Sequence, residues 1–191
     1  MSMPSLKEKN KIVHYFGFGT NKDLAMMEHM IGRKKIKGTP GVLIGYALCI
    51  QRTDQFREEI PPTTPYAVPA KKLILNTWGP KFEMYVSRPN PTGLTYGTVW
   101  EITPEELAFV REWELVDYGC QEDAWGFALV KGKLQKVITQ SFMKPPIDID
   151  RVVTGKNYPA YIWSKKAMLK RADEIHEMYL QYLKNGKVYL D

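Results

Sequence analysis

Two segments of the sequence carry the residue types that could do chemistry. Residues 13–21 read Val-His-Tyr-Phe-Gly-Phe-Gly-Thr-Asn, an apolar run that enters a glycine-containing turn. Residues 97–114 read as a strand, a turn and a short helix that ends in acidic residues. Free backbone N–H groups in such a turn can hold a carboxylate or a carbonyl oxygen, and a carboxylate placed over the turn can transfer protons. The order and spacing of the two segments therefore indicate an acid–base site.

The turn Phe18-Gly19-Thr20-Asn21 has two compatible interpretations. It can be an anion- or carbonyl-binding loop at the start of a helix, or a plain connection from strand to helix with Thr20 as the cap. The four residues alone favour the plain connection. A cap uses only one or two of the free N–H groups, however, and leaves the others for a ligand.

Four glutamates lie on or near the helix predicted after Pro104: Glu105, Glu106, Glu112 and Glu114. Glu105 and Glu106 fall in the first turn, where the helix dipole stabilises negative charge, so we interpret them as structural. Glu114 follows Trp113 at the end of the helix, where the dipole is unfavourable. It needs a partner or a pocket there, although a solvated surface glutamate fits the sequence equally well.

Other kinds of site have little support in the sequence. His14, His29 and His176 are far apart and share no metal-ligand spacing, so we expect no metal site. No serine stands in a nucleophile elbow, and no Walker or dinucleotide-type glycine pattern occurs. Tyr161, just before the last predicted helix, could close a pocket with its hydroxyl, although packing at the helix entry explains it as well.

The elements that would position these residues alternate between strands and helices. Strands are expected at 12–18, 42–50, 73–78, 82–86 and 96–102, with a hairpin at 124–130 and 134–142 and loops at 51–70 and 88–93. A helix is expected at 21–31, where Thr20 and Asp23 form a capping-box-like pair. A second helix is expected after Pro104, with Thr103 as its cap, and a third at 163–185. The last helix has one apolar face, which we expect to pack on the barrel: Met168, Ala172, Ile175, Tyr179 and Tyr182. These elements favour an α+β fold whose mixed or antiparallel sheet curls into a small barrel.

The chain of 191 residues indicates a single domain over 1–191, with a polar lead-in at 1–10 and a C-terminal helix at 163–185. Cys49 and Cys120 have no metal-ligand spacing and suit a reducing compartment. The beginning of the chain has no apolar signal region, and no apolar run approaches the roughly 20 residues of a membrane span. We expect a cytoplasmic protein without a membrane partner. The net charge is +6, and the basic residues are scattered along the sequence. This distribution favours a solubilising surface over a nucleic-acid-binding face.

Together the two segments resemble the γ-glutamylcyclotransferase-like superfamily, which includes AIG2-like and γ-glutamylamine cyclotransferase-like proteins. Its members usually begin with a strand that ends in Tyr-Gly-Ser-Asn, matched here by residues 18–21. They later carry a strand and a Glu-Glu-Leu helix that leads to a catalytic glutamate, matched here by 97–102 and 105–114. Residues 41–46 look like the family's second strand, and 159–161 like a segment that ends in a pocket tyrosine. The chain departs from the pattern at Phe18 for Tyr, Thr20 for Ser and Leu115 for Gly.

The resemblance implies a small β-barrel with flanking helices and an enzyme, a transferase or lyase, that acts on a small γ-glutamyl substrate. Such enzymes release 5-oxoproline when the substrate's α-amine attacks its own γ-carbonyl, and they need no metal or cofactor. Glu114 would be the general acid and base, with a pKa raised by burial beside Trp113. The substrate-binding residues would be Phe18, Gly19, Thr20, Asn21, Lys22 and Tyr161.

This family interpretation makes a geometric prediction: Gly19, Thr20, Asn21, Glu114 and Tyr161 should line one cavity. Glu112, two residues from Glu114, should point elsewhere. The alternative is a small-ligand-binding or protein-interaction member of the same fold, because fold does not fix function. A weaker alternative is a nucleic-acid accessory that uses the basic C-terminal helix. The sequence indicates neither the released amine nor an oligomeric state.

Overall fold

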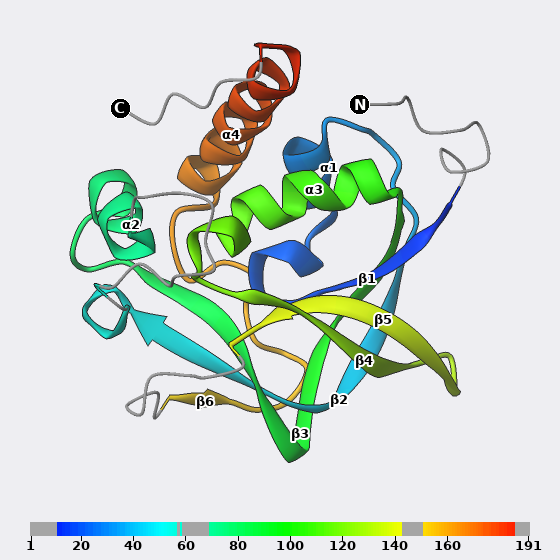
Figure 1. Ribbon diagram of the computed structural model, residues 1–191. Coiled ribbons are helices and arrows are strands. Elements are labelled where there is room, and N and C mark those ends of the chain that lie inside the picture. Colours follow the sequence, from blue (N-terminus) through cyan, green and yellow to red (C-terminus); the bar gives the residue numbers. More distant parts are fainter. Residues whose placement is uncertain (1–10, 57, 59–68, 143–150, 186–191) are drawn as a thin grey trace.

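In the described part of the chain, a small barrel of five strands forms the base of the molecule, and four α-helices cover one side of it (Figure 1). The computed structural model describes residues 11–56, 58, 69–142 and 151–185, so the lead-in expected at 1–10 lies outside the described residues. The strands are β1 (Val13–Gly17), β2 (Gly38–Arg52), β3 (Glu83–Ile102), β4 (Glu122–Val130), β5 (Lys133–Ser141) and the short β6 (Val152–Val153). The α-helices are α1 (Leu24–Ile31), α2 (Ala70–Trp78), α3 (Pro104–Trp113) and α4 (Lys165–Asn185), and the short 3-10 helices are η1 (Gly19–Lys22), η2 (Thr53–Gln55) and η3 (Val116–Tyr118). The predicted α+β class and small mixed barrel are confirmed.

Strand pairing closes the barrel around β1. This strand pairs antiparallel with β3, with Val13 opposite Ile102, and parallel with β5, with Tyr15 opposite Ile138. Antiparallel pairs of β3 with β2, β2 with β4 and β4 with β5 complete the circuit. Because β1 lies between β3 and β5, its C-terminal end carries the 18–22 turn to the end of the barrel that the helices cover (Figure 1).

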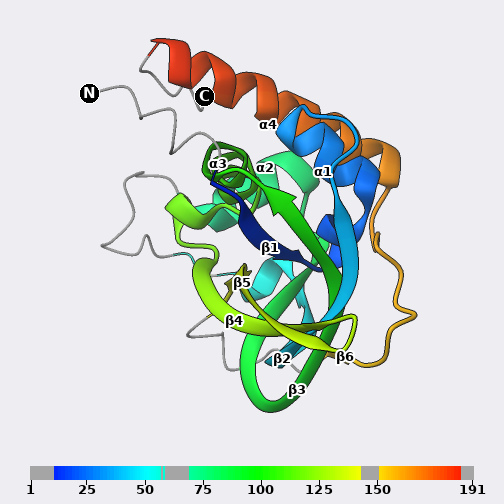
Figure 2. The same ribbon diagram turned by 90° about the vertical axis from the view of Figure 1, so that its right-hand side faces the viewer.

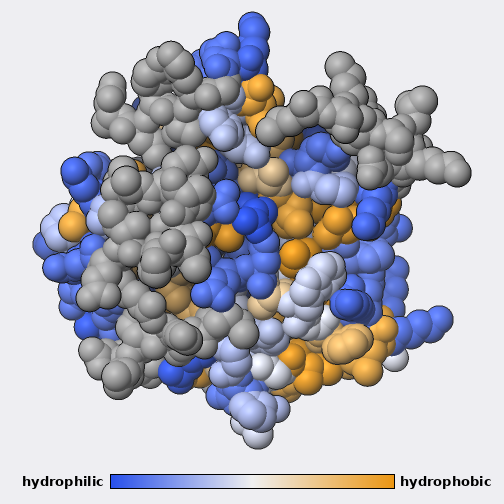
Figure 3. Space-filling view, viewed as in Figure 1, coloured by the Kyte–Doolittle hydropathy of each residue, from blue (hydrophilic) through white to orange (hydrophobic). Residues whose placement is uncertain are grey.

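The outer face of β4 is more apolar than its inner face. Trp125, Phe127 and Leu129 alternate outward and are 61%, 55% and 42% exposed, whereas the inward Ala124 and Ala128 are buried. The interior is narrow here and leaves room only for small residues on this strand, because side chains of the other strands fill it. Apolar atoms accordingly reach the surface on the side of the barrel (Figure 3).

The helix α3 begins as its sequence predicts. The Thr103 hydroxyl accepts a hydrogen bond from the N–H of Glu106, and the Glu106 carboxylate accepts one from the N–H of Thr103. Pro104 occupies the first helical turn, where its missing N–H costs nothing. This reciprocal cap fixes where α3 starts, and so fixes where Glu114 falls at its other end.

The last helix packs mainly on two other helices, α1 and α3, whereas we expected it to pack on the barrel. Figure 2 shows α4 running across α1 and α3 on the outside of the helical layer. The His176 ring bonds the Met30 carbonyl oxygen at 2.9 Å and stacks on Phe109 with ring centroids 4.5 Å apart. Met168 and Ala172 are buried in this layer, while Ile175 is only partly buried.

Three local predictions were wrong. Residues 73–78, expected as a strand, belong to α2, where the side chains of Ala70, Leu73, Ile74 and Trp78 follow the helical period. Residues 88–93, expected as a loop, continue β3 despite two prolines, because β3 pairs there only with β2. The cap of α1 is Asp23 alone, whose carboxylate accepts from the N–H of Met26, and Thr20 lies in η1.

Candidate active site

Close packing of the backbone fixes the 18–22 turn. A Cβ on Gly17 would lie 2.3 Å from the carbonyl oxygen of Asn21, so a side chain at 17 would push the turn away. The Asn21 N–H donates to the Phe18 carbonyl at 3.0 Å, and the Trp100 indole donates to the Asn21 carbonyl at 2.7 Å. Gly19 has a φ of +56°, a conformation that glycine adopts without strain. The turn therefore holds Asn21 with its amide directed into the molecule, where it is 2% exposed.

The Glu114 side chain meets this amide at the end of α3. Oε1 of Glu114 accepts a hydrogen bond from Nδ2 of Asn21 at 2.6 Å, and Oε2 accepts one from Nε2 of Gln121. The Asn21 amide also donates to the Tyr15 hydroxyl at 2.8 Å. Glu114 is 7% exposed. The two segments that the sequence analysis singled out thus meet at one buried carboxylate.

The backbone after Glu114 turns sharply to make this possible. Leu115 adopts φ 53° and ψ 38°, the left-handed conformation that favours glycine. Its N–H donates to the Glu112 carbonyl, and its own carbonyl accepts from Tyr118 and Cys120. Leu115 therefore keeps the backbone shape that a glycine would have at this position, and its side chain adds apolar contact to the core.

Burial tunes the acidity of the carboxyl group. Loss of solvent raises the pKa of Glu114 to about 7, although the hydrogen bonds from Asn21 and Gln121 oppose the rise by stabilising the charged form. A carboxyl group with this pKa exists in both protonation states near neutrality, so it can accept one proton and deliver another. Burial also raises the pKa of the neighbouring Cys120 thiol, with a further contribution from the Glu114 charge. Cys120 is therefore a protonated, unreactive thiol.

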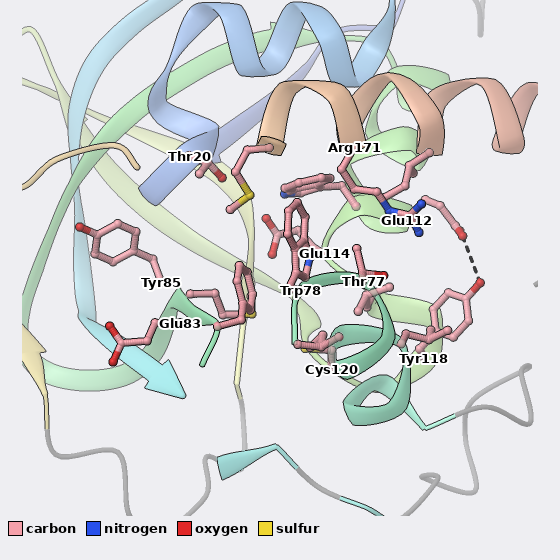
Figure 4. A pocket seen from close by; sticks show the side chains of 18 of the residues that line it. Thr20, Thr77, Trp78, Glu83, Tyr85, Glu112, Glu114, Tyr118, Cys120 and Arg171 are labelled. Atoms are coloured by element: carbon pink, nitrogen blue, oxygen red, sulfur yellow. Dashed lines mark hydrogen bonds between the residues drawn. The ribbon is translucent and has the colours of Figure 1, made fainter. Parts of the chain in front are cut away.

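A cavity of about 100 Å³ opens beside the carboxylate. Phe18 and Thr20 of the turn, Glu114 and the side chains of α2 and α4 form its walls. Figure 4 shows Glu114 near the centre of this wall, with Thr20 and Tyr85 on one side and Glu112 with Tyr118 on the other. The site therefore combines a proton-transfer group, a polar turn and room for a small molecule.

Solved structures of other proteins share this fold. A human protein described as uncharacterised has a TM-score of 0.53 and 12% sequence identity to this chain, and the match covers 95% of this chain and 90% of that one. A γ-glutamyl cyclotransferase has the same TM-score and coverages with 14% identity. The chain has the γ-glutamylcyclotransferase-like fold. At these identities the likeness establishes the fold alone, and it confirms the superfamily resemblance at that level. No protein-family model and no curated protein matches the sequence.

Within this γ-glutamylcyclotransferase-like fold, the residues predicted to bind substrate have different surroundings. Phe18 and Thr20 line the cavity. The Gly19 N–H donates to the Tyr158 hydroxyl at 3.3 Å. The Asn21 amide donates to the Glu114 carboxylate, and Asn21 is not among the described residues that line the cavity. The Lys22 ammonium donates to the Tyr158 carbonyl at 2.6 Å and lies over the Tyr158 ring.

Tyr161 is not among the described residues that line the cavity. Burial and then the negative charge of Asp23 raise the pKa of its hydroxyl. The Lys165 ammonium lies over the Tyr161 ring, 5.0 Å from the centroid. Tyr158, three residues earlier, is the tyrosine that contacts the turn, and its hydroxyl donates to the Tyr96 carbonyl.

Glu112, which we expected to point elsewhere than Glu114, also lines the cavity, on the side of Tyr118 (Figure 4). Its carboxylate accepts from the Tyr118 hydroxyl at 3.2 Å, and burial raises the pKa of Glu112. Sequence reasoning also missed Tyr15 and Gln121. Tyr15 could have been found from the alternation of β1, which puts it on the same face as Gly17, whereas nothing local marks Gln121.

The described residues contain no group of three or more His, Cys, Asp or Glu side chains that could hold a metal ion. Within the same residues, no helix has the length and apolar character needed to cross a membrane.

Proposed function

We propose that the protein is a γ-glutamyl cyclotransferase-type enzyme that releases 5-oxoproline from a γ-glutamyl amide, without a metal or cofactor. The observation that carries this proposal is the buried carboxyl group of Glu114, on the wall of a cavity next to the 18–22 turn. Burial raises the pKa of this group to about 7. In the reaction, the α-amine nitrogen of the substrate forms a bond to its γ-carbonyl carbon, and the bond from that carbon to the amide nitrogen breaks. The products are 5-oxoproline and a protonated amine.

Glu114 carries the protons in this scheme. In its charged form it accepts a proton from the substrate's α-ammonium group, which frees the nitrogen lone pair for attack. The protonated Glu114 then delivers that proton to the departing amide nitrogen, which makes it a better leaving group. As the ring closes, the attacking nitrogen loses a second proton, which passes through the same carboxylate to the amine, so the amine leaves protonated. A pKa of about 7 suits both steps, because neither protonation state is strongly favoured near neutrality.

The turn would stabilise the oxygen of the attacked carbonyl. Two of its N–H groups already have acceptors, since Gly19 donates to Tyr158 and Asn21 to Phe18. Thr20 lines the cavity, and its N–H has no acceptor among the described residues. We therefore assign the carbonyl-binding role to Thr20. Phe18 packs against the substrate, and Gly19, Asn21, Lys22 and Tyr161 support the site from behind.

The buried free thiols of Cys49 and Cys120 fit a reducing compartment, and we place this activity in the cytoplasm. We take the whole chain as one functional domain with a small-molecule substrate, and we expect no nucleic-acid partner.

The test is 5-oxoproline release from a set of γ-glutamyl amides, with the corresponding α-glutamyl amides as controls. We expect release from γ-glutamyl amides only, because cyclisation that expels the amine requires that amine on the γ-carbonyl. If no γ-glutamyl amide yields 5-oxoproline but one binds to the protein, the alternative of a ligand-binding member of this fold replaces the enzyme.

A further inference from the structure

The cavity extends well beyond the carboxylate. From Glu114 it continues between α2 and α4, and its volume of about 100 Å³ is several times the roughly 10–15 Å³ that a single water needs. If the γ-glutamyl group reacts at Glu114, its γ-carbonyl and the leaving nitrogen lie at that end. The remaining space must then receive the group attached to the leaving nitrogen.

The walls of this remaining space are apolar and aromatic. They include Ile74 and Trp78 of α2, Phe82 just before β3, Trp113 of α3 and Met178 of α4. The Trp78 and Phe82 rings are stacked with centroids 5.1 Å apart, and Trp163 packs edge-on against Phe82 at 5.6 Å. Stacked rings held by a third ring form a rigid surface, which suits a flat or apolar group.

The other charged residues that line the cavity already have hydrogen-bond or ion-pair partners. Apart from Glu114, the described charged residues that line the cavity are Glu83, Glu112 and Arg171. Glu83 pairs with Arg151, Glu112 accepts from the Tyr118 hydroxyl, and Arg171 donates to a Glu174 carboxylate oxygen at 3.0 Å. A charged group on the leaving amine would lose its water there. Glu83 and Arg171 are already in ion pairs, and burial disfavours the charged form of Glu112, whose partner is a neutral hydroxyl.

We propose that the natural substrate is a γ-glutamyl amide of an uncharged, apolar amine with an aromatic or long alkyl group. This assignment rests on the proposed function, because it uses the placement of the γ-glutamyl group at Glu114. Burial of each apolar CH2 contributes about 0.8 kcal/mol, or roughly fourfold in affinity. An aromatic amine should therefore be strongly favoured over a small or charged one.

The first test compares three substrates that share the γ-glutamyl group: γ-glutamyl-phenethylamide, γ-glutamyl-methylamide and γ-glutamyl-glycine. Affinity is measured calorimetrically on Glu114→Gln, which keeps the cavity but should not turn the amides over, and kcat/KM is measured on the parent. We expect the phenethylamide to bind at least about tenfold more tightly than either of the others, and to show the same order in kcat/KM. Equal or weaker binding of the phenethylamide would overturn the proposal.

The second test makes the apolar wall polar. Met178→Gln keeps the side-chain length but places an amide in the cavity wall, and Leu75→Gln makes the same kind of change on α2 outside the cavity. We expect Met178→Gln to lower the ratio of phenethylamide to methylamide affinity at least about threefold, because an amide loses hydrogen bonds to water beside an apolar ligand. Leu75→Gln should leave the ratio unchanged. An unchanged ratio in Met178→Gln contradicts the proposal.

The two proposals fail separately. Tight phenethylamide binding without any 5-oxoproline release would remove the enzymatic activity and keep the apolar site. Release of 5-oxoproline from all three amides at similar kcat/KM would keep the activity and remove the apolar substrate class.

Discussion

The cavity is polar at the end formed by the 18–22 turn and apolar at the end formed by α2 and α4. At the polar end, the Glu114 carboxyl group is buried and accepts hydrogen bonds from two side-chain amides, and loss of solvent disfavours its charged form and raises its pKa. At the apolar end, aromatic rings pack on one another and fill space. The apolar end therefore stabilises the fold, while the polar end costs folding free energy above neutral pH, where Glu114 would carry its charge out of water.

The largest effect on stability is expected at the apolar end. Phe82→Ala removes a side chain that is 4% exposed and stacked on Trp78, so it should lower the free energy of unfolding by about 3–5 kcal/mol. Leu75→Ala, at a 37%-exposed position of α2, should cost far less. Urea unfolding of both variants checks this difference. A similar small loss for both would mean that the aromatic wall contributes little to stability.

A smaller and opposite effect is expected at the polar end, where it depends on pH. The pKa of Glu114 is about 7 in the folded protein against 4.5 as its ordinary value, so the folded chain binds more protons at this site between those pH values. Stability from this group is therefore present below about pH 4.5 and is lost as pH rises to about 7. The loss is on the order of 3 kcal/mol.

Glu114→Gln does not titrate at this position, so it isolates the effect. The difference in unfolding free energy, Glu114→Gln minus parent, should increase on the order of 3 kcal/mol as the pH rises from about 4.5 to about 8. Urea unfolding at both pH values measures the change, with Glu105→Gln, at an exposed position of the same helix, as the matched control. A constant difference between Glu114→Gln and the parent across this range would show that the carboxyl group is not held at the raised pKa.

The smallest effect on stability is expected at Leu115, in the backbone that joins the polar end of the cavity to the apolar end. At Leu115, with φ 53°, a glycine is unstrained and an alanine is not, so Leu115→Gly should be more stable than Leu115→Ala by about 1 kcal/mol. At Leu107, inside α3, the order should reverse by a similar amount, because glycine is a poor helix former. Thermal melts of the four variants give the order of glycine and alanine at each position. The same order at both positions would refute a left-handed Leu115.

Much of the frame of the site could be predicted from the sequence. Thr103, Pro104 and Glu106 define the start of α3 by local hydrogen bonds, which depend on few other residues. The glycine-containing turn after β1 and the position of Glu114 at the helix end follow from the same kind of local signal. These features were predictable because their causes lie within a few residues of one another.

The remaining features depend on contacts between distant residues. Gln121 bonds Glu114 only because the chain reverses through Leu115, whose left-handed backbone no local signal predicts. The α2 helix was mistaken for a strand because its apolar run Leu73-Ile74-Leu75 is short, and only the wider spacing back to Ala70 distinguishes the two. Which tyrosine contacts the turn, Tyr158 or Tyr161, is likewise decided by how the chain passes the barrel.

The central claim is that Glu114 transfers the protons, and Glu114→Gln tests it most directly. The new amide would present N–H groups where an oxygen now accepts from Asn21 or Gln121. The Gln121 Oε1 has no hydrogen-bond partner among the described residues, so rotation of the Gln121 amide can supply an acceptor and the fold should survive.

The measurement is 5-oxoproline release from one γ-glutamyl amide by the parent, Glu114→Gln and Glu105→Gln, with folding checked by circular dichroism. Loss of the general base should lower kcat for Glu114→Gln by roughly 10²–10⁴-fold, and Glu105→Gln should match the parent. Equal rates for the parent and a folded Glu114→Gln would contradict the assignment of Glu114 as the catalytic residue.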